Sequence, residues 1–176
     1  MAKQVDARQA LRGGDRRSIG RANEIAEVAK TDPGVFAQLM DGMAADDPLI
    51  VMRCADAAEK ASLFDPRLLA PHKPKLLKML ASAEQPELRW HIAQMVPRLS
   101  LTSPQAKKAF SRLLDYTQDR SGIVRTCAMQ ALHDLALSHA SLRREALQHI
   151  QQLVKVGSPA MIARGKRLVR SLQRAE

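Results

Sequence analysis

Residues 119–135 read DRSGIVRTCAMQALHDL. Apolar residues recur in this stretch at Ala128, Leu132 and Leu135, the spacing of a helix with one buried face. Asp119 stands six residues before Arg125, ahead of the apolar run. The stretch therefore predicts an amphipathic helix that opens near an acidic residue and has an arginine close to its start.

The same arrangement recurs along the chain. An arginine begins an apolar helical run in five segments, at intervals of 32, 36, 36 and 39 residues: Arg21, Arg53, Arg89, Arg125 and Arg164. Other amphipathic stretches lie between these runs. A repeat of this length is typical of stacked helix pairs, because neighbouring pairs bury together a face that one pair cannot bury alone.

Dipeptides with proline as the second residue separate the amphipathic stretches. They mark helix starts, since proline at the first helical position loses no intrahelical hydrogen bond. We expect one repeat domain over residues 1–176 with helix pairs over about 3–30, 33–62, 72–100, 104–139 and 141–174. The proline-rich stretch 64–74 should be an irregular connector, and Pro97 should kink or shorten its helix.

An aspartate precedes the arginine by six residues in three of the segments: Asp15 with Arg21, Asp47 with Arg53, and Asp119 with Arg125. With Val124 before Arg125, this arrangement resembles the HEAT repeat, whose second helix opens with Asp and continues with a Val-Arg pair. The resemblance covers most of the chain. It implies an all-α fold, a right-handed α–α superhelix (solenoid) of about five antiparallel helix pairs.

In the HEAT family these Asp and Arg side chains form a ladder between neighbouring repeats. The resemblance implies this structural role for Asp15, Arg21, Asp47, Arg53, Arg89, Asp119, Arg125 and Arg164. Ala83 and Ser158 stand where two further aspartates would be, which predicts an interrupted ladder. Armadillo and other helix-pair solenoids are alternatives, as is an ordinary helical bundle.

Catalytic and metal-binding constellations are not evident in the sequence. Five histidines are scattered (His72, His91, His133, His139 and His149), and no two share the i, i+4 spacing of a metal site. His133 is next to Asp134, but adjacent helical residues do not face each other. A phosphate-binding glycine loop and a nucleophile elbow are also missing. We therefore expect no catalytic residue, no metal, no cofactor and no enzymatic activity.

Charge is unevenly distributed along the chain. Residues 31–66 hold seven acidic and two basic side chains, and residues 67–176 hold seven acidic and nineteen basic ones. We interpret a group of carboxylates as a solvated acidic segment: Asp41, Asp46, Asp47, Asp56 and Glu59. The net charge of +10 and the basic C-terminal half predict an anionic partner, either an acidic protein or nucleic acid.

Cys54 and Cys127 lie inside apolar helical stretches, where we expect buried, reduced thiols. No window approaches the 18 or so uncharged apolar residues of a membrane span. The N-terminal residues lack the apolar region of a signal peptide. These features predict a cytoplasmic protein with no membrane partner.

In the HEAT comparison the second helices line the concave face. Candidate partner-binding residues are those pointing away from the apolar stripes: Trp90, Gln94, Arg98, Gln130, His133, Arg167 and Arg170. Trp90 is the single tryptophan, and an exposed tryptophan could anchor a partner. Partial packing against the next repeat is the other interpretation of Trp90.

The repeats and the missing catalytic groups favour a non-catalytic scaffold for protein–protein interaction, with an acidic protein as partner. Nucleic-acid binding through the basic C-terminal half is the alternative. HEAT-like folds also include DNA glycosylases for alkylated bases. That activity needs an aromatic-plus-carboxylate pocket for the extruded base, and Trp90 has no convincing carboxylate companion.

Overall fold

The computed structural model describes residues 5–15 and 17–175. Within these ranges ten α-helices are joined by turns and three short 3-10 helices, and there is no β-strand. The predicted all-α class is thus confirmed. The chain divides into two compact units, Met1–Leu99 and Ser100–Glu176, and each is described by itself.

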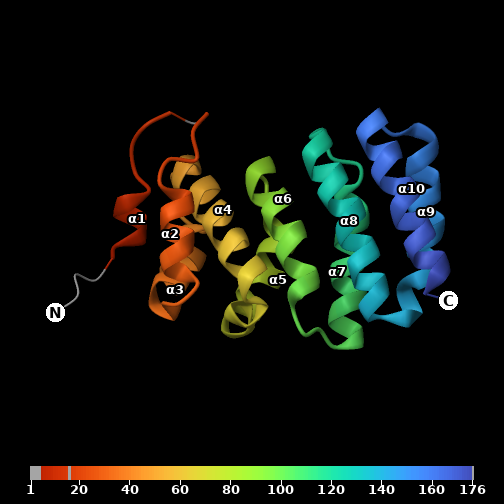
Figure 1. Cartoon of the computed structure of the whole chain (residues 1–176), viewed down its shortest axis with the longest axis horizontal. Helices are drawn as coiled ribbons and strands as arrows, with labels where there is room; N and C mark the ends of the chain where they lie inside the picture. The colour runs from red at the N-terminus through yellow and green to blue at the C-terminus, as the bar shows by residue number, and fades with distance from the viewer. Residues whose placement is uncertain (1–4, 16, 176) are drawn as a thin grey trace. The chain divides into compact units, whose positions relative to one another are not determined.

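The N-terminal unit is built around one long helix. Its α-helices are α1 (Ala7–Ala10), α2 (Ala22–Ala29), α3 (Pro33–Gly42), α4 (Pro48–Phe64), α5 (Lys73–Ser82) and α6 (Pro86–Met95) (Figure 1). The 3-10 helix η1 (Pro66–His72) joins α4 to α5, and η2 (Val96–Arg98) follows α6. Helix α4 packs against α2, α3 and α6 and is therefore the centre of this unit.

The C-terminal unit holds two helix pairs (Figure 1). They consist of α7 (Ser103–Tyr116), α8 (Gly122–Ser138), α9 (Arg143–Val156) and α10 (Pro159–Arg174), with the 3-10 helix η3 (Ala140–Leu142) before α9. Helix α8 packs against α7, α9 and α10, and α9 packs against α10. Among the described residues, no helix combines the length and apolarity needed to cross a membrane.

Helix starts follow the proline punctuation of the sequence. Asp32 caps α3 and Asp47 caps α4, each accepting backbone N–H bonds, and a proline holds the next position. Ser158 and Pro159 begin α10 in the same way. Thr102 begins α7 as half of a reciprocal capping box. Local capping chemistry thus fixes where these helices begin.

The first helix pair differs from its predicted bounds. Helix α1 is only four residues long, and α2 covers Ala22–Ala29, so the two helices fill less of the range 3–30 than predicted. The predicted start of the first helix, at residue 3, lies outside the described residues. Gly13, Gly14 and Gly20 have φ of 77°, 82° and 55°, a left-handed conformation that does not continue a helix. These glycines make the connection a loop.

Arg53 of α4 determines the path of this loop. Its side chain is buried, and among the described residues its guanidinium donates to backbone carbonyls of the loop. Nη1 donates to Leu11 (2.8 Å) and Gly13 (2.5 Å). Nε donates to Ser18 and Nη2 to Asp15, each at 3.1 Å. The ladder implied carboxylate partners for the repeat arginines. Arg53 instead holds the loop between α1 and α2 through hydrogen bonds to the backbone carbonyls of that loop.

Pro97 shortens its helix as predicted. The α-helical part of α6 ends at Met95, and the chain continues as the 3-10 helix η2. The connector over 64–74 is more regular than expected, because Asp65 accepts the backbone N–H of Arg67 and begins a seven-residue 3-10 helix.

The two thiols differ in exposure. Cys54 is fully buried in α4, as expected, but Cys127 is partly exposed on α8.

Burial raises the pKa of the Cys54 thiol to about 12. Since the thiolate is the reacting species, Cys54 should react with a disulfide reagent only after unfolding, and Cys127 should react first. With a disulfide reagent that releases a chromophore, absorbance measures the reaction rates of the two thiols, and Cys127→Ser is the control. Fast reaction of Cys54 in the folded protein would contradict this expectation.

Candidate binding surface

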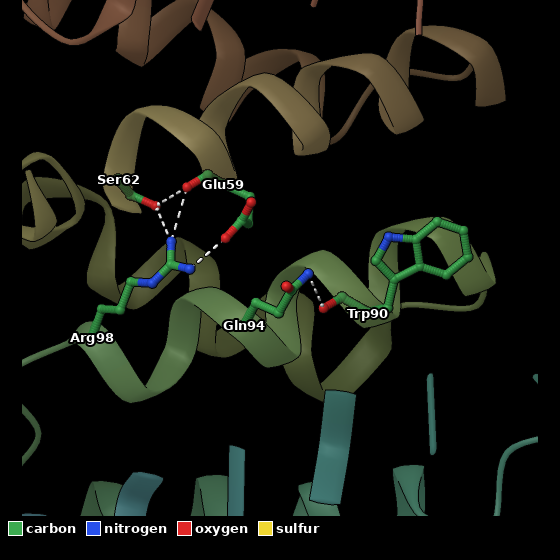
Figure 2. Close-up of polar contacts among 5 residues, drawn as sticks. All are labelled: Glu59, Ser62, Trp90, Gln94 and Arg98. Atoms are coloured by element: carbon green, nitrogen blue, oxygen red, sulfur yellow. Dashed lines mark hydrogen bonds and ion pairs between the residues drawn. The ribbon is translucent and has the colours of Figure 1, made fainter. Parts of the chain in front are cut away.

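Three candidate partner-binding residues lie along α6 and η2. Trp90, Gln94 and Arg98 are spaced by four residues and form one row (Figure 2). The Gln94 Nε2 donates to the Trp90 carbonyl at 3.3 Å. Trp90 is partly exposed, and its ring centroid lies 5.5 Å from that of the His91 ring. A partly exposed aromatic side chain therefore lies in line with two polar side chains.

Arg98 joins η2 to α4. Its guanidinium forms an ion pair with the Glu59 carboxylate and donates to the Glu59 carbonyl and the Ser62 hydroxyl, both at 2.9 Å (Figure 2). The side chains are only 17% and 11% exposed for Arg98 and Glu59. Two expectations change as a result. Glu59 is not part of a solvated acidic segment, and Arg98 is engaged within the fold, where it positions the row.

Lys60 of α4 makes one contact within its own helix and one with α2. The Lys60 ammonium donates to the Asp56 carboxylate and to the Asn23 side-chain oxygen, each at 2.6 Å. Asp56 and Lys60 are one helical turn apart, a spacing that stabilises helices. We name these residues of α2, α4, α6 and η2 the polar row: Asn23, Asp56, Glu59, Lys60, Trp90, Gln94 and Arg98.

Two exposed apolar side chains end α4, one turn beyond Glu59 and Lys60. Leu63 is 66% exposed and Phe64 is 68% exposed. The Lys30 ammonium lies 5.1 Å from the centroid of the Phe64 ring, within cation–π range. Exposed Leu and Phe side chains next to each other are a common feature of protein interaction sites. The polar row therefore has an apolar neighbour on the same helix.

His91 follows Trp90 on α6, and burial lowers the pKa of its imidazole. The charged groups that act on it are Asp56, Glu59 and Lys60 of α4 and Glu87 of α6. At 7% exposure His91 is buried, and no hydrogen bond is found for its Nδ1 among the described residues. The folded protein thus favours the neutral ring.

Acidification should therefore destabilise the protein through His91. The unfolded chain binds a proton at the ordinary pKa of about 6.5, so stability is lost as pH falls below it, by about 1.4 kcal/mol for each unit of pKa difference. Burial also lowers the pKa of His72 and His149. Between about pH 7 and 5, urea unfolding should show that the free energy of unfolding falls less for His91→Gln than for wild type. Equal losses in the two proteins would contradict this expectation.

The candidates of the C-terminal unit lie in two places. The Gln130 amide donates to the Asp134 carboxylate at 2.9 Å, and the His133 Nδ1 lies 2.8 Å from the same oxygen. The expectation that His133 and Asp134 do not meet is therefore wrong, because the carboxylate turns toward the neighbouring ring. His133 is buried at 6% exposure and is not a free surface contact. Arg167 and Arg170 are exposed on α10.

The residues of the predicted ladder have local contacts. Asp47 caps α4, Asp15 accepts the backbone N–H of Arg17, and Asp119 accepts that of Ser121. Arg21 forms an ion pair with Glu24, and the Arg89 Nε donates to the Ala83 carbonyl. Arg125 and Arg164 are partly exposed. Pairing of these arginines with aspartates of neighbouring repeats stays a prediction.

Four residues of the polar row were missed as site residues by sequence reasoning: Asn23, Asp56, Glu59 and Lys60. Only the i, i+4 pair of Asp56 and Lys60 is visible in the sequence. Asn23 and Glu59 belong to the row because α2 and α6 pack against α4, which brings Asn23 to Lys60 and Arg98 to Glu59, 37 and 39 residues apart in the chain. Within the described ranges, no group of three His, Cys, Asp or Glu side chains could hold a metal ion.

Comparison with known proteins defines the class of fold. No protein-family model and no curated protein matches the chain. The crystal structure of an engineered protein matches with a TM-score of 0.64 and 15% identity, covering 96% of this chain and 78% of the other. A computationally designed armadillo repeat protein for modular peptide recognition matches with a TM-score of 0.60 and 13% identity, covering 96% and 80%. The chain has the all-α fold of helical-repeat solenoids.

Proposed function

We propose that this protein is a non-catalytic scaffold of HEAT-type repeats that binds a peptide segment of a partner protein along the polar row. The observation that carries the proposal is the geometry of that row. Cross-helix contacts from Lys60 and Arg98 fix its polar groups. Trp90 stays partly exposed, and Leu63 is mostly exposed. Fixed polar groups beside aromatic and aliphatic anchors lower the ordering cost of binding.

Two further observations support the proposal. One structure with the same fold is described as designed for modular peptide recognition. The finer assignment to HEAT repeats rests on the signature formed by Asp119, Val124 and Arg125. Solenoids of this kind use extended surfaces for binding, which suits a row that crosses three helices.

Selection of a random-peptide display library on the immobilised full chain tests the proposal. Fluorescence anisotropy should show that Trp90→Ala weakens the selected peptides by about tenfold or more. Leu63→Ser should weaken them as well. Lys78→Ala, at an exposed position on α5, is the matched control and should leave affinity unchanged.

Two outcomes would contradict the proposal. Selected peptides that bind Trp90→Ala and wild type equally well would exclude the polar row as their site. Failure to select any peptide, together with salt-sensitive binding to duplex DNA or RNA that Arg167→Glu and Arg170→Glu abolish, would establish the nucleic-acid alternative.

A further inference from the structure

A groove of about 590 Å³ runs between α9 and α10 in the C-terminal unit. Seven residues line it: Gln151, Gln152, Val154, Lys155, Lys166, Val169 and Arg170. They lie outside the buried stripes of the two helices, which include Ile150 and Leu153 on α9 and Leu168 and Leu172 on α10. The groove is thus formed by residues that lie outside these buried stripes.

The groove has an apolar floor and a basic rim. Val154 and Val169 are partly buried, whereas Lys155, Lys166 and Arg170 are exposed. Gly165 lets α10 approach Val154 closely, since a Cβ atom at this position would lie 2.5 Å from the Val154 Cγ2. The close approach places Val154 against α10, and Val169 lines the same groove one helical turn after Gly165.

The helix pair around the groove is strongly positive. Residues 143–175 contain eight Lys and Arg side chains and one carboxylate, that of Glu145. Such a surface attracts and orients anionic partners. Charge alone would suit either nucleic acid or an acidic protein.

The apolar floor favours a protein. A nucleic-acid backbone offers phosphates to the rim but nothing apolar to bury on Val154 and Val169. Single strands also gain affinity by stacking bases on aromatic rings, and residues 143–175 contain no Phe, Tyr or Trp. An amphipathic helix, in contrast, presents an apolar stripe flanked by charged side chains.

We infer that the groove between α9 and α10 binds an acidic amphipathic helix of a partner protein. Its apolar side chains pack on Val154 and Val169, and its carboxylates pair with Lys155, Lys166 and Arg170. This site belongs to the C-terminal unit and does not depend on the polar row, so the protein has a second docking surface with its own charge preference.

A synthetic peptide probe tests this inference. The probe is a fluorescein-labelled peptide of about 15 residues with Leu at i, i+3 and i+4 positions and Glu elsewhere. Its binding to the full chain is measured by anisotropy. Lys166→Glu with Arg170→Glu should weaken binding by about tenfold or more. Lys107→Glu with Lys108→Glu, exposed on α7 and outside the groove, should change it by less than about twofold.

Methyl NMR locates the bound peptide. The methyl signals of Val154 and Val169 should shift during the titration, and those of Val124, buried in α8, should not. Trp90→Ala should leave this binding intact, so that a failure here is distinguishable from a failure of the polar row. A scrambled or all-Glu peptide that binds as tightly, a single-stranded oligonucleotide that binds more tightly, or unchanged valine methyls would each overturn the inference.

Discussion

Replacing Arg98 with Met should lower the free energy of unfolding by about 3 kcal/mol, because the Glu59 carboxylate would stay nearly buried without its cation. The substitution also removes the hydrogen-bond donors to the Glu59 carbonyl and the Ser62 hydroxyl. Since these contacts join η2 to α4, the C-terminal end of the polar row should loosen. Urea unfolding followed by circular dichroism measures the loss.

Two further variants make this expectation specific. Glu59→Leu combined with Arg98→Met removes both charges and should recover part of the stability lost in the single variant. Arg67→Met is the matched control, because the side chain of Arg67 is 90% exposed in its ion pair with Asp65 and its loss should have little effect. An Arg98→Met variant no less stable than Arg67→Met would show that the buried pair does not hold η2 to α4.

Arg53→Met should destabilise the protein by about 2–4 kcal/mol, since four charge-assisted hydrogen bonds to the loop over 11–18 are lost. The carbonyls of Gly13, Asp15 and Ser18 belong to exposed residues and can turn to water, which limits the loss, whereas the bond to the Leu11 carbonyl is buried. Hydrogen exchange should therefore quicken first in the loop, while α4 stays protected. Arg53→Lys keeps the charge but not the planar fork of donors, so its stability should lie between those of wild type and Arg53→Met.

Substitution of two glycines in the same loop also tests the contact between the loop and the Arg53 guanidinium. A Cβ atom at Gly20 would lie 2.9 Å from the Arg53 Cζ, whereas one at Gly13 would meet nothing within 4 Å. Both positions have positive φ, so alanine costs about 1 kcal/mol of backbone strain at each. Gly20→Ala should therefore be the more damaging substitution. Equal thermal stabilities of the two variants would argue against a loop held tightly on the guanidinium.

Much of the fold is predictable from local sequence signals. Asp47 and Pro48 begin α4 because a side-chain cap and a proline at the first helical position act within a few residues. Pro97 ends α6 for an equally local reason. The repeated apolar stripe then indicates which face each helix buries, which is enough to predict stacked pairs.

The first helix pair was harder to predict, because its course depends on distant contacts. Gly13 and Gly20 have positive φ, but the sequence does not reveal that their loop packs around Arg53, 40 and 33 residues further along. The resemblance gave Arg53 a structural role with a carboxylate partner. Its partners are backbone carbonyls, and any residue can supply a carbonyl, so the sequence carries no mark of them.

The candidate site was predicted only in part, because some of its contacts join residues that are distant in the sequence. The helical periodicity placed Trp90, Gln94 and Arg98 in one row. Charge composition, however, predicted solvent around Glu59, whereas the packing of α6 on α4 places Arg98 beside it. The groove between α9 and α10 depends likewise on the close approach at Gly165, a property of two helices in contact.

The ion pair between Arg98 and Glu59 also bears on where the chain can be divided. Arg98 is the penultimate residue of the N-terminal unit and comes after the last α-helical residue of α6, Met95. A fragment that ends at Met95 would contain every α-helix of the unit but not Arg98, so the Glu59 carboxylate near the C-terminal end of α4 would lose its cation. When this protein is divided into halves, the N-terminal fragment should therefore extend at least to Arg98, three residues beyond the last residue of α6.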